Sequence, residues 1–90
     1  MNQTKEKVLI NFKKAQSHLT KITKMIEEKR YCIDIMQQNL AVIGLLKSAN
    51  QQLLEGHLKS CFSNEMKGSN ETRKKKMIDE ILYLEKMSNK

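Results

Sequence analysis

Three side chains of this 90-residue chain combine the types and the spacing of a metal-ligand set. His57 and Cys61 are four residues apart, which on a helix places an imidazole and a thiol one turn apart on the same face. Such a pair by itself is more often core filling than a binding site. Cys32 strengthens the case for a metal site, because the 25 residues from Cys32 to His57, at ~100° each, return a helix to within about 20° of its starting direction. Cys32, His57 and Cys61 therefore share one helix face.

The distance along that helix decides how the three residues can meet. At ~1.5 Å per residue, Cys32 and His57 lie about 37 Å apart on one straight helix. Two copies packed antiparallel about a two-fold axis bring each Cys32 to His57 and Cys61 of the other copy, which creates two identical sites. The axis then passes near Leu45–Leu46. A hairpin bending at Gly44 is the alternative, and it is less favoured because an isolated glycine without turn residues beside it is tolerated within a helix.

Two thiolates and one imidazole make a soft, three-coordinate donor set. That set suits Cu(I), which prefers thiolate and accepts low coordination numbers. Zn(II) favours a fourth ligand, and Ni(II) favours more nitrogen in a square-planar array. We therefore expect Cu(I) as the cofactor, with nickel and zinc as the alternatives. No nucleophile–base pair or cofactor-binding loop stands out, so we expect neither an enzyme nor a small-molecule substrate.

The elements that must position these residues are helices. The chain has no proline and only three glycines, which favours long helices over a loop-rich or all-β fold. Apolar residues at helical spacing predict an all-α domain spanning residues 1–90, with helices over about 4–28, 31–66 and 71–87. Gly68-Ser69-Asn70 marks the clearest break, with Ser69 or Asn70 as a helix cap. The junction at residues 27–30 contains neither glycine nor proline and is poorly signalled.

Each predicted helix has an apolar side that needs a neighbour. The first carries Val8, Phe12, Ala15, Leu19, Ile22 and Met25–Ile26, and the third carries Met77, Ile78, Ile81, Leu82 and Leu84. The second has a coiled-coil-like 3-4 seam of Ile33, Met36, Leu40, Ile43, Lys47, Asn50, Leu54, His57 and Cys61. Leu46, Ala49 and Leu53 widen this face, so the second helix is expected to pack on more than one neighbour. With four aromatic residues in the whole chain, we expect oligomerisation to complete the core.

The net charge of +7 favours an anionic partner. Basic residues concentrate at the two ends of the chain, around a near-neutral apolar middle. The run Arg73-Lys74-Lys75-Lys76 lies at the start of the third predicted helix, which is unfavourable for the helix dipole. We expect this run to be a solvated face, to be mobile or to meet an anionic partner. No membrane span or signal peptide is expected, and we place the protein in the cytoplasm, where thiols stay reduced.

Two sequence runs resemble the copper-sensing members of the CsoR/RcnR repressor family. They are Arg30-Tyr31-Cys32-Ile33-Asp34-Ile35 and Glu55-Gly56-His57-Leu58-Lys59-Ser60-Cys61. The family pattern reads R-Y-C-[IV]-D-[IV]-L, then about twenty residues, then E-x-H-L-x-x-C. Met25-Ile26-Glu27-Glu28 resembles a further family segment, and the likeness covers most of residues 8–61. The Cys…His-x-x-x-Cys combination is typical of the family's copper sensors, whereas its persulfide sensors lack the histidine.

The resemblance implies a three-helix protomer, an antiparallel dimer and a dimer-of-dimers tetramer. It also implies a repressor whose metal-free form binds operator DNA and releases it when metal binds. Cys32, His57 and Cys61 then become Cu(I) ligands shared across the dimer interface. Tyr31 matches a tyrosine beside the first ligand. Glu80, within Ile78-Asp79-Glu80-Ile81-Leu82, matches a carboxylate that would hold the Nδ1–H of His57.

The first helix departs from the family pattern. Where the family often reads R-L-[KR]-R-I-E-G-Q-V-R-G, this chain reads Asn11-Phe12-Lys13-Lys14-Ala15-Gln16-Ser17-His18-Leu19-Thr20-Lys21. Lysine gives phosphate a point charge but lacks the bidentate geometry of arginine. We expect phosphate contacts from Lys13, Lys14, Lys21, Lys24 and Lys47. The alternatives are a repressor that senses persulfide or oxidant through Cys32 and Cys61, and a metal-binding protein of this fold with weakened DNA binding.

Overall fold

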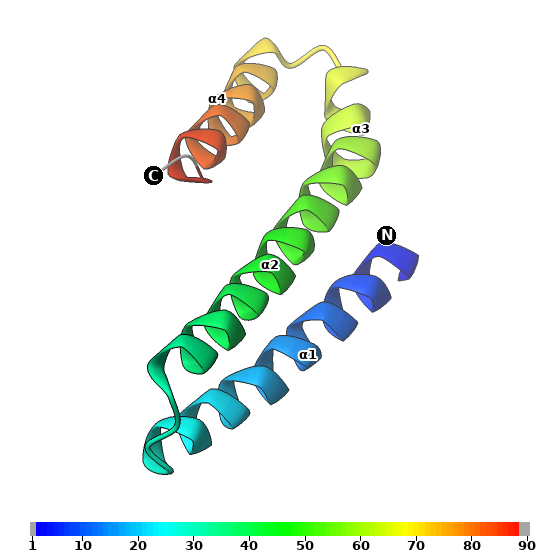
Figure 1. The fold of residues 1–90 in the computed structure, drawn as a ribbon. Helices are drawn as coiled ribbons and strands as arrows, with labels where there is room; N and C mark the ends of the chain where they lie inside the picture. Colours follow the sequence, from blue (N-terminus) through cyan, green and yellow to red (C-terminus); the bar gives the residue numbers. More distant parts are fainter. Residues whose placement is uncertain (1, 89–90) are drawn as a thin grey trace. The chain divides into compact units, whose positions relative to one another are not determined.

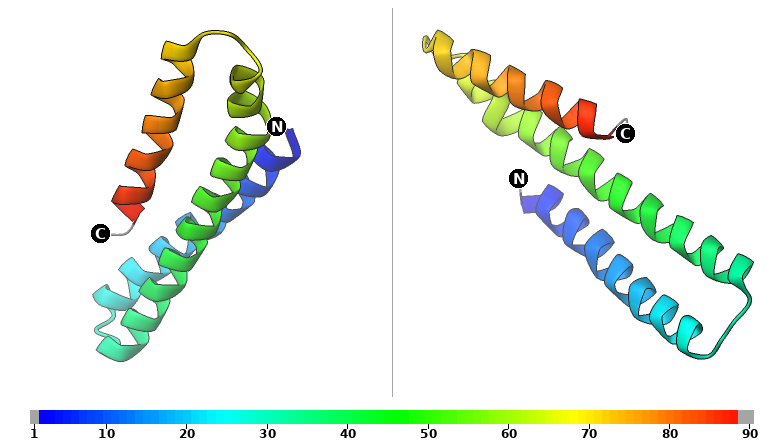
Figure 2. Two further views of the ribbon diagram at one scale, coloured as in Figure 1. Left: turned by 90° about the horizontal axis from the view of Figure 1, so that it is seen from above. Right: turned by 90° about the vertical axis from the view of Figure 1, so that its left-hand side faces the viewer.

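A computed structural model describes residues 2–88 of the chain, with side chains from Thr4 onward (Figures 1 and 2). Within this range the regular elements are all helical and no strand occurs, which confirms the all-α class. The elements are α1 (Asn2–Glu27), α2 (Cys32–His57), the π-helical turn η1 (Leu58–Phe62), α3 (Ser63–Met66) and α4 (Glu71–Ser88). The predicted helices 4–28 and 71–87 differ from α1 and α4 by at most two residues at each end, whereas the single helix predicted over 31–66 is divided into α2, η1 and α3. Residues 1, 89 and 90 of the predicted domain lie outside the described residues.

By its internal contacts the chain divides into two compact units, Met1–Gly56 and His57–Lys90. In the first unit, α1 and α2 form a helical hairpin, in which they lie side by side and run antiparallel (Figures 1 and 2). The second unit contains η1, α3 and α4. No helix in the described range is long and apolar enough to cross a membrane.

The turn between α1 and α2 closes without glycine. Lys29 adopts a left-handed backbone with φ 57°, a conformation that glycine usually supplies after a helix. The N–H of Arg30 donates to the carbonyl of Met25 at 2.9 Å, and the N–H of Lys29 donates to that of Ile26 at 3.1 Å. These two bonds form a Schellman motif, which satisfies the last carbonyl groups of α1. The hairpin therefore has a defined turn at the junction that the sequence signalled poorly.

The hairpin core consists of small and medium-sized residues at heptad spacing. Val8, Ala15 and Met25 are buried on α1, whereas Val42 and Ala49 are buried on α2. Gly56, seven residues after Ala49, continues the buried face of α2. Small residues at successive contact positions allow two helices to approach closely. The α1-facing side of α2 is therefore the heptad of Val42, Ala49 and Gly56.

The predicted seam of α2 is a different face, and much of it remains exposed in the single chain. Ile33, Met36, Leu40 and Ile43 are 45%, 51%, 66% and 39% exposed. On α1, Phe12, Leu19 and Ile26 are likewise exposed, although the sequence assigns them to the same apolar side as Val8 and Ala15. An unpartnered apolar stripe of this length needs a further surface to cover it. The sequence predicts that α2 packs on more than one neighbour, and in the described single chain this face of α2 remains exposed.

In the second unit, α4 begins at a side-chain cap. Asn70 accepts a hydrogen bond from the N–H of Arg73 through its Oδ1 atom, at 3.1 Å. Asn70 is therefore the N-cap, one of the two residues predicted for it. Glu71 lies in the first turn, where a negative charge is favourable. Met77 is the buried residue of this helix, while Ile78, Leu82 and Leu84 are exposed.

Candidate metal centre and nucleic-acid surface

Cys32 is the first residue of α2 and is an exposed free thiol. The carbonyl of Tyr31 accepts the N–H of Ile35 at 3.2 Å, which begins the helix one residue before the cysteine. Asp34 lies in the first turn, where its charge favours the helix N-terminus. The Tyr31 side chain is 68% exposed. The Schellman turn at Lys29 and this helix start fix the backbone on both sides of Cys32.

His57 and Cys61 lie on either side of the change from α-helical to π-helical backbone. His57 is the last residue of α2 and is half-buried. Cys61 belongs to η1 and is an exposed free thiol. At the end of this turn the N–H of Ser63 donates to the carbonyl of Leu58, five residues back. The Oγ atom of Ser60 lies 3.9 Å from the Sγ atom of Cys61.

The π turn changes the geometry that the sequence assumes for the histidine–cysteine pair. In an α-helix, four residues pass one full turn by about 40°. With π-type bonding a turn takes more residues, so four residues fall short of a full turn. In both cases the two side chains stack one turn apart, within reach of one ion. No residue type in Leu58–Phe62 signals a π turn, so sequence reasoning missed it; such turns are frequent at functional sites.

The single chain does not bring the predicted ligands together. Cys32 and His57 stand at opposite ends of α2, which separates them by about 37 Å along the helix. Among residues 2–88, no three His, Cys, Asp or Glu side chains of one chain form a group suited to a metal ion. The donor chemistry nevertheless fits Cu(I), since two accessible thiols and an imidazole form a soft set. A complete three-ligand site therefore requires a second copy.

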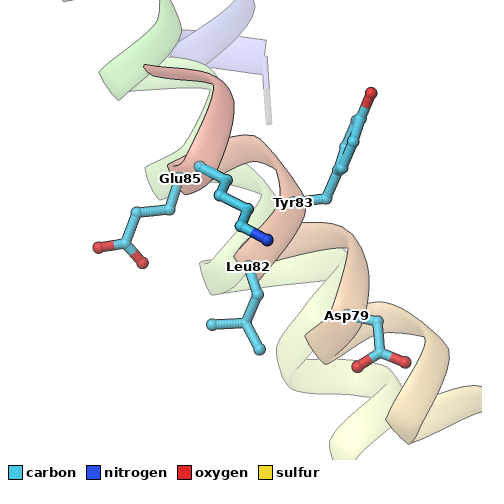
Figure 3. A pocket seen from close by; sticks show the side chains of 5 residues that line it. Asp79, Leu82, Tyr83 and Glu85 are labelled. Carbon is cyan, nitrogen blue, oxygen red and sulfur yellow. The ribbon is translucent and has the colours of Figure 1, made fainter. Parts of the chain in front are cut away.

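Glu80 lies on α4 and is exposed. Within the described part of the second unit, no hydrogen bond joins Glu80 to His57. The surface of α4 near it has a shallow hollow lined by Asp79, Leu82, Tyr83, Glu85 and Lys86 (Figure 3). In Figure 3 the labelled side chains splay away from the helix rather than toward a common point. This hollow therefore has no convergent group that would suit a ligand.

The five lysines predicted to contact DNA are all exposed: Lys13, Lys14, Lys21, Lys24 and Lys47. On α1, Lys13 and Lys24 lie roughly opposite the buried Ala15 at ~100° per residue, whereas Lys14 and Lys21 lie about 100° and 120° away from it, on the flank of the helix. Lys13 and Lys14 also border a shallow hollow with Ile10, Ser17 and His18. The Nδ1 atom of His18 is buried and has no hydrogen-bond partner. The outer side of α1 is thus a cationic strip suited to a phosphate backbone.

The basic run at the start of α4, unlike the lysines of α1, forms ion pairs within its own unit. Arg73 pairs with Glu65 of α3 at 2.7 Å, and Lys74 pairs with Glu71 at 3.2 Å. Half of the run thus has carboxylate partners within its own unit, which the sequence did not anticipate. Lys75 and Lys76 are exposed. The expectation of an anionic partner for the whole run therefore applies at most to these two lysines.

The chain is thus a small all-α protein with candidate soft metal ligands at the two ends of α2 and in η1, and with a cationic strip on α1. The sequence model of the metal-sensitive transcriptional repressor family matches residues 4–86. The chain belongs to this family, and its resemblance to the CsoR/RcnR repressors is confirmed. Membership in a family of repressors also agrees with the expectation that the chain is not an enzyme.

Several relatives of this chain are named as copper-sensing transcriptional repressors. The chain is 40% identical over 63 residues to the copper-sensing transcriptional repressor CsoR of Mycobacterium ulcerans, covering 70% of this chain and 54% of that protein. It is 34% identical over 80 residues to the CsoR of Mycobacterium bovis, covering 88% of this chain and 67% of the relative. The chain thus spans about half to two thirds of these relatives' lengths.

A solved structure shares the fold over the whole chain. It is the crystal structure of the copper-sensing repressor CsoR with Cu(I) from Geobacillus thermodenitrificans, at a TM-score of 0.86 and 27% sequence identity. The match covers 100% of this chain and 91% of that one. The all-helical fold of this chain is therefore similar to that of the solved CsoR structure.

Proposed function

We propose that this chain is a Cu(I)-responsive transcriptional repressor of the cytoplasm. Its metal-free form binds operator DNA through the lysine strip of α1, and metal binding releases the DNA. The observation that carries the proposal is the placement of Cys32 and His57 at the two ends of one uninterrupted helix, α2. Two antiparallel copies of such a helix complete two Cys32/His57/Cys61 sites at once.

The exposed seam of α2 supports this pairing. Met36 and Ile43 lie within about 40° of the direction of Cys32 on α2 at ~100° per residue, and both are exposed. Gly44, close to the proposed axis, has nothing within 4 Å of where a Cβ would stand, so a partner helix has room to approach there. Burial of apolar side chains of this kind contributes ~25 cal/mol per Å², from which the entropic cost of association is subtracted. The proposed assembly is a dimer, with a dimer-of-dimers tetramer implied by the family.

Each ligand has a defined part in holding the ion. Cys32 would supply a thiolate from one copy, and His57 and Cys61 would supply an imidazole and a thiolate from the other. When bound, Cu(I) would supply a soft metal centre that prefers the thiolates of the two cysteines. Tyr31 and Glu80 are the proposed outer partners, with Glu80 orienting the His57 ring. The names of the relatives favour this assignment over the thiol-sensing alternative.

The test is an anaerobic Cu(I) titration of the reduced protein against a strong chromogenic chelator. We expect the unmodified chain to take about one Cu(I) per protomer from the chelator, as two sites per dimer require. Cys61→Ala should lose this ability, whereas Ser48→Ala, at an exposed serine of α2, should keep it. If the unmodified chain fails to compete, the three residues are not a Cu(I) site, and the thiol chemistry of Cys32 and Cys61 becomes the better explanation.

A further inference from the structure

A polar pair interrupts the apolar contact between α1 and α2. Asn11 donates through Nδ2 to the Oε1 atom of Gln52 at 2.9 Å, across 41 positions of sequence. Both residues are half-buried. Asn11 stands where the family pattern often has an arginine, so the pair belongs to this chain rather than to that pattern.

The residues around the pair leave it little freedom. Val8 and Ala15, three positions before and four after Asn11, are buried. Ala49 and Gly56 flank Gln52 in the same way and are buried too. The two half-buried amides thus satisfy each other at the edge of the apolar contact, and loss of one partner costs about one ordinary hydrogen bond, ~1 kcal/mol. A single polar pair within an apolar helix contact fixes the register of the two helices.

The pair also lies between two functional segments. Asn11 precedes Lys13 and Lys14 of the cationic strip by two and three residues. Gln52 precedes His57 by five residues in the same helix, α2. The hydrogen bond therefore ties the part of α1 that carries these lysines to the part of α2 that leads to the metal ligand.

We propose that Asn11 and Gln52 are a positioning pair that transmits copper binding to the DNA surface. Their hydrogen bond holds Lys13 and Lys14 in fixed register with the end of α2 that bears His57, so that a change at the ligand alters the placement of the lysines. This inference rests on the proposed function. It adds the physical link by which the metal site and the DNA surface act on each other, and such coupling is reciprocal.

The test compares operator affinity with and without Cu(I) in matched variants. Asn11→Leu/Gln52→Leu replaces both amides with apolar groups of similar size, which limits damage to packing. Gln37→Leu is the control, because Gln37 is an exposed glutamine of α2. Fluorescence anisotropy on DNA from upstream of the chain's own gene gives the two dissociation constants. Chelator competition gives the Cu(I) affinity, and circular dichroism reports folding.

We expect the double variant to bind Cu(I) within about twofold of the unmodified chain. The ratio of its two DNA dissociation constants should fall about fivefold, the factor that corresponds to one ordinary hydrogen bond. Gln37→Leu should keep the full ratio. Gln52→Glu should also keep it, since a carboxylate still accepts from Asn11. Asn11→Ala is the second test variant, and a lower ratio is expected for it as well, which keeps the proposal falsifiable if the double variant does not fold.

The outcomes separate this inference from the proposed function. If the unmodified chain releases DNA with Cu(I) and both test variants release it equally well, the positioning role is wrong while the proposed function stands. A variant that loses thermal stability with an unchanged ratio also overturns the positioning role, because it shows a merely structural bond. If the unmodified chain itself never releases DNA, the proposed function fails, and the pair has nothing to transmit.

Discussion

Complementation between two defective chains tests whether each copper site is shared by two copies. One chain carries Cys32→Ala, and the other carries both His57→Ala and Cys61→Ala. Cys32 and His57 stand at opposite ends of α2, about 37 Å apart along the helix, whereas a metal–sulfur bond is about 2.3 Å long. A straight α2 therefore excludes a site made within one chain, and neither variant forms a complete site by itself.

The expected stoichiometry follows from the two-fold pairing. In an equal mixture, about half of the dimers combine the two kinds of chain. Each mixed dimer has one intact site, made from the Cys32 of one chain and the His57 and Cys61 of the other, and one site that has lost all three ligands. We therefore expect about 0.25 Cu(I) per chain in the mixture, against about one in the unmodified protein and none in either variant alone.

The assay mixes the variants in denaturant, refolds them together under reducing and anaerobic conditions, and measures bound Cu(I) by chelator competition. Two batches of Cys32→Ala treated identically are the control and should bind none. The reasoning is refuted if the mixture binds no more than its components. It is equally refuted if Cys32→Ala alone retains one tightly bound Cu(I) per chain.

Three further predictions concern the helix ends and the cationic strip. Lys29→Gly should raise the free energy of unfolding by about 1 kcal/mol and the melting temperature by about 4–8 °C, because glycine adopts the left-handed backbone at this turn without strain. A lower melting temperature in a thermal denaturation scan would show that the positive φ of Lys29 does not strain the turn. Asn70→Ala should cost about 1 kcal/mol, since the N–H of Arg73 loses its cap; an unchanged urea midpoint would show that the cap does not stabilise α4. Lys14→Ala should lower the magnitude of the slope of log K against log salt for DNA binding by about 0.9, whereas Lys67→Ala, at an exposed lysine outside the predicted DNA contacts, should leave it unchanged. Anisotropy titrations at several salt concentrations decide between them, and equal slopes for the two variants would remove Lys14 from the DNA surface.

Much of the fold was predictable because its signals are local. The scarcity of breakers gave long helices, and Gly68-Ser69-Asn70 placed the start of α4 correctly, with Asn70 as the cap. The turn at Lys29 was poorly marked because its Schellman bonds use the backbone alone, which any residue supplies. The π turn at Leu58–Phe62 was missed for a similar reason, since it has no characteristic residue.

The spacing of apolar residues alone does not decide which face of α2 packs against α1. On α2, both the Val42/Ala49/Gly56 heptad and the seam containing Met36 and Leu40 have helical spacing. Only tertiary packing selects the first for α1 and leaves the second exposed. The ligand set could be predicted from the sequence because the angle between the Cys32 and His57 side chains around the helix axis depends only on the number of residues between them. The position of Glu80 relative to His57 depends instead on how separate helices pack, which the sequence does not encode locally.

The most direct test of the central claim is the effect of Cu(I) on DNA binding by the reduced protein. Labelled DNA from upstream of the chain's own gene is followed by fluorescence anisotropy while Cu(I) is added anaerobically, with Cys32→Ser as the matched variant. The account predicts that the metal-free protein binds the DNA, that about one Cu(I) per protomer releases it, and that the Cys32→Ser complex persists. DNA binding that is indifferent to Cu(I) in the unmodified chain, or release that is equally complete in Cys32→Ser, would contradict it.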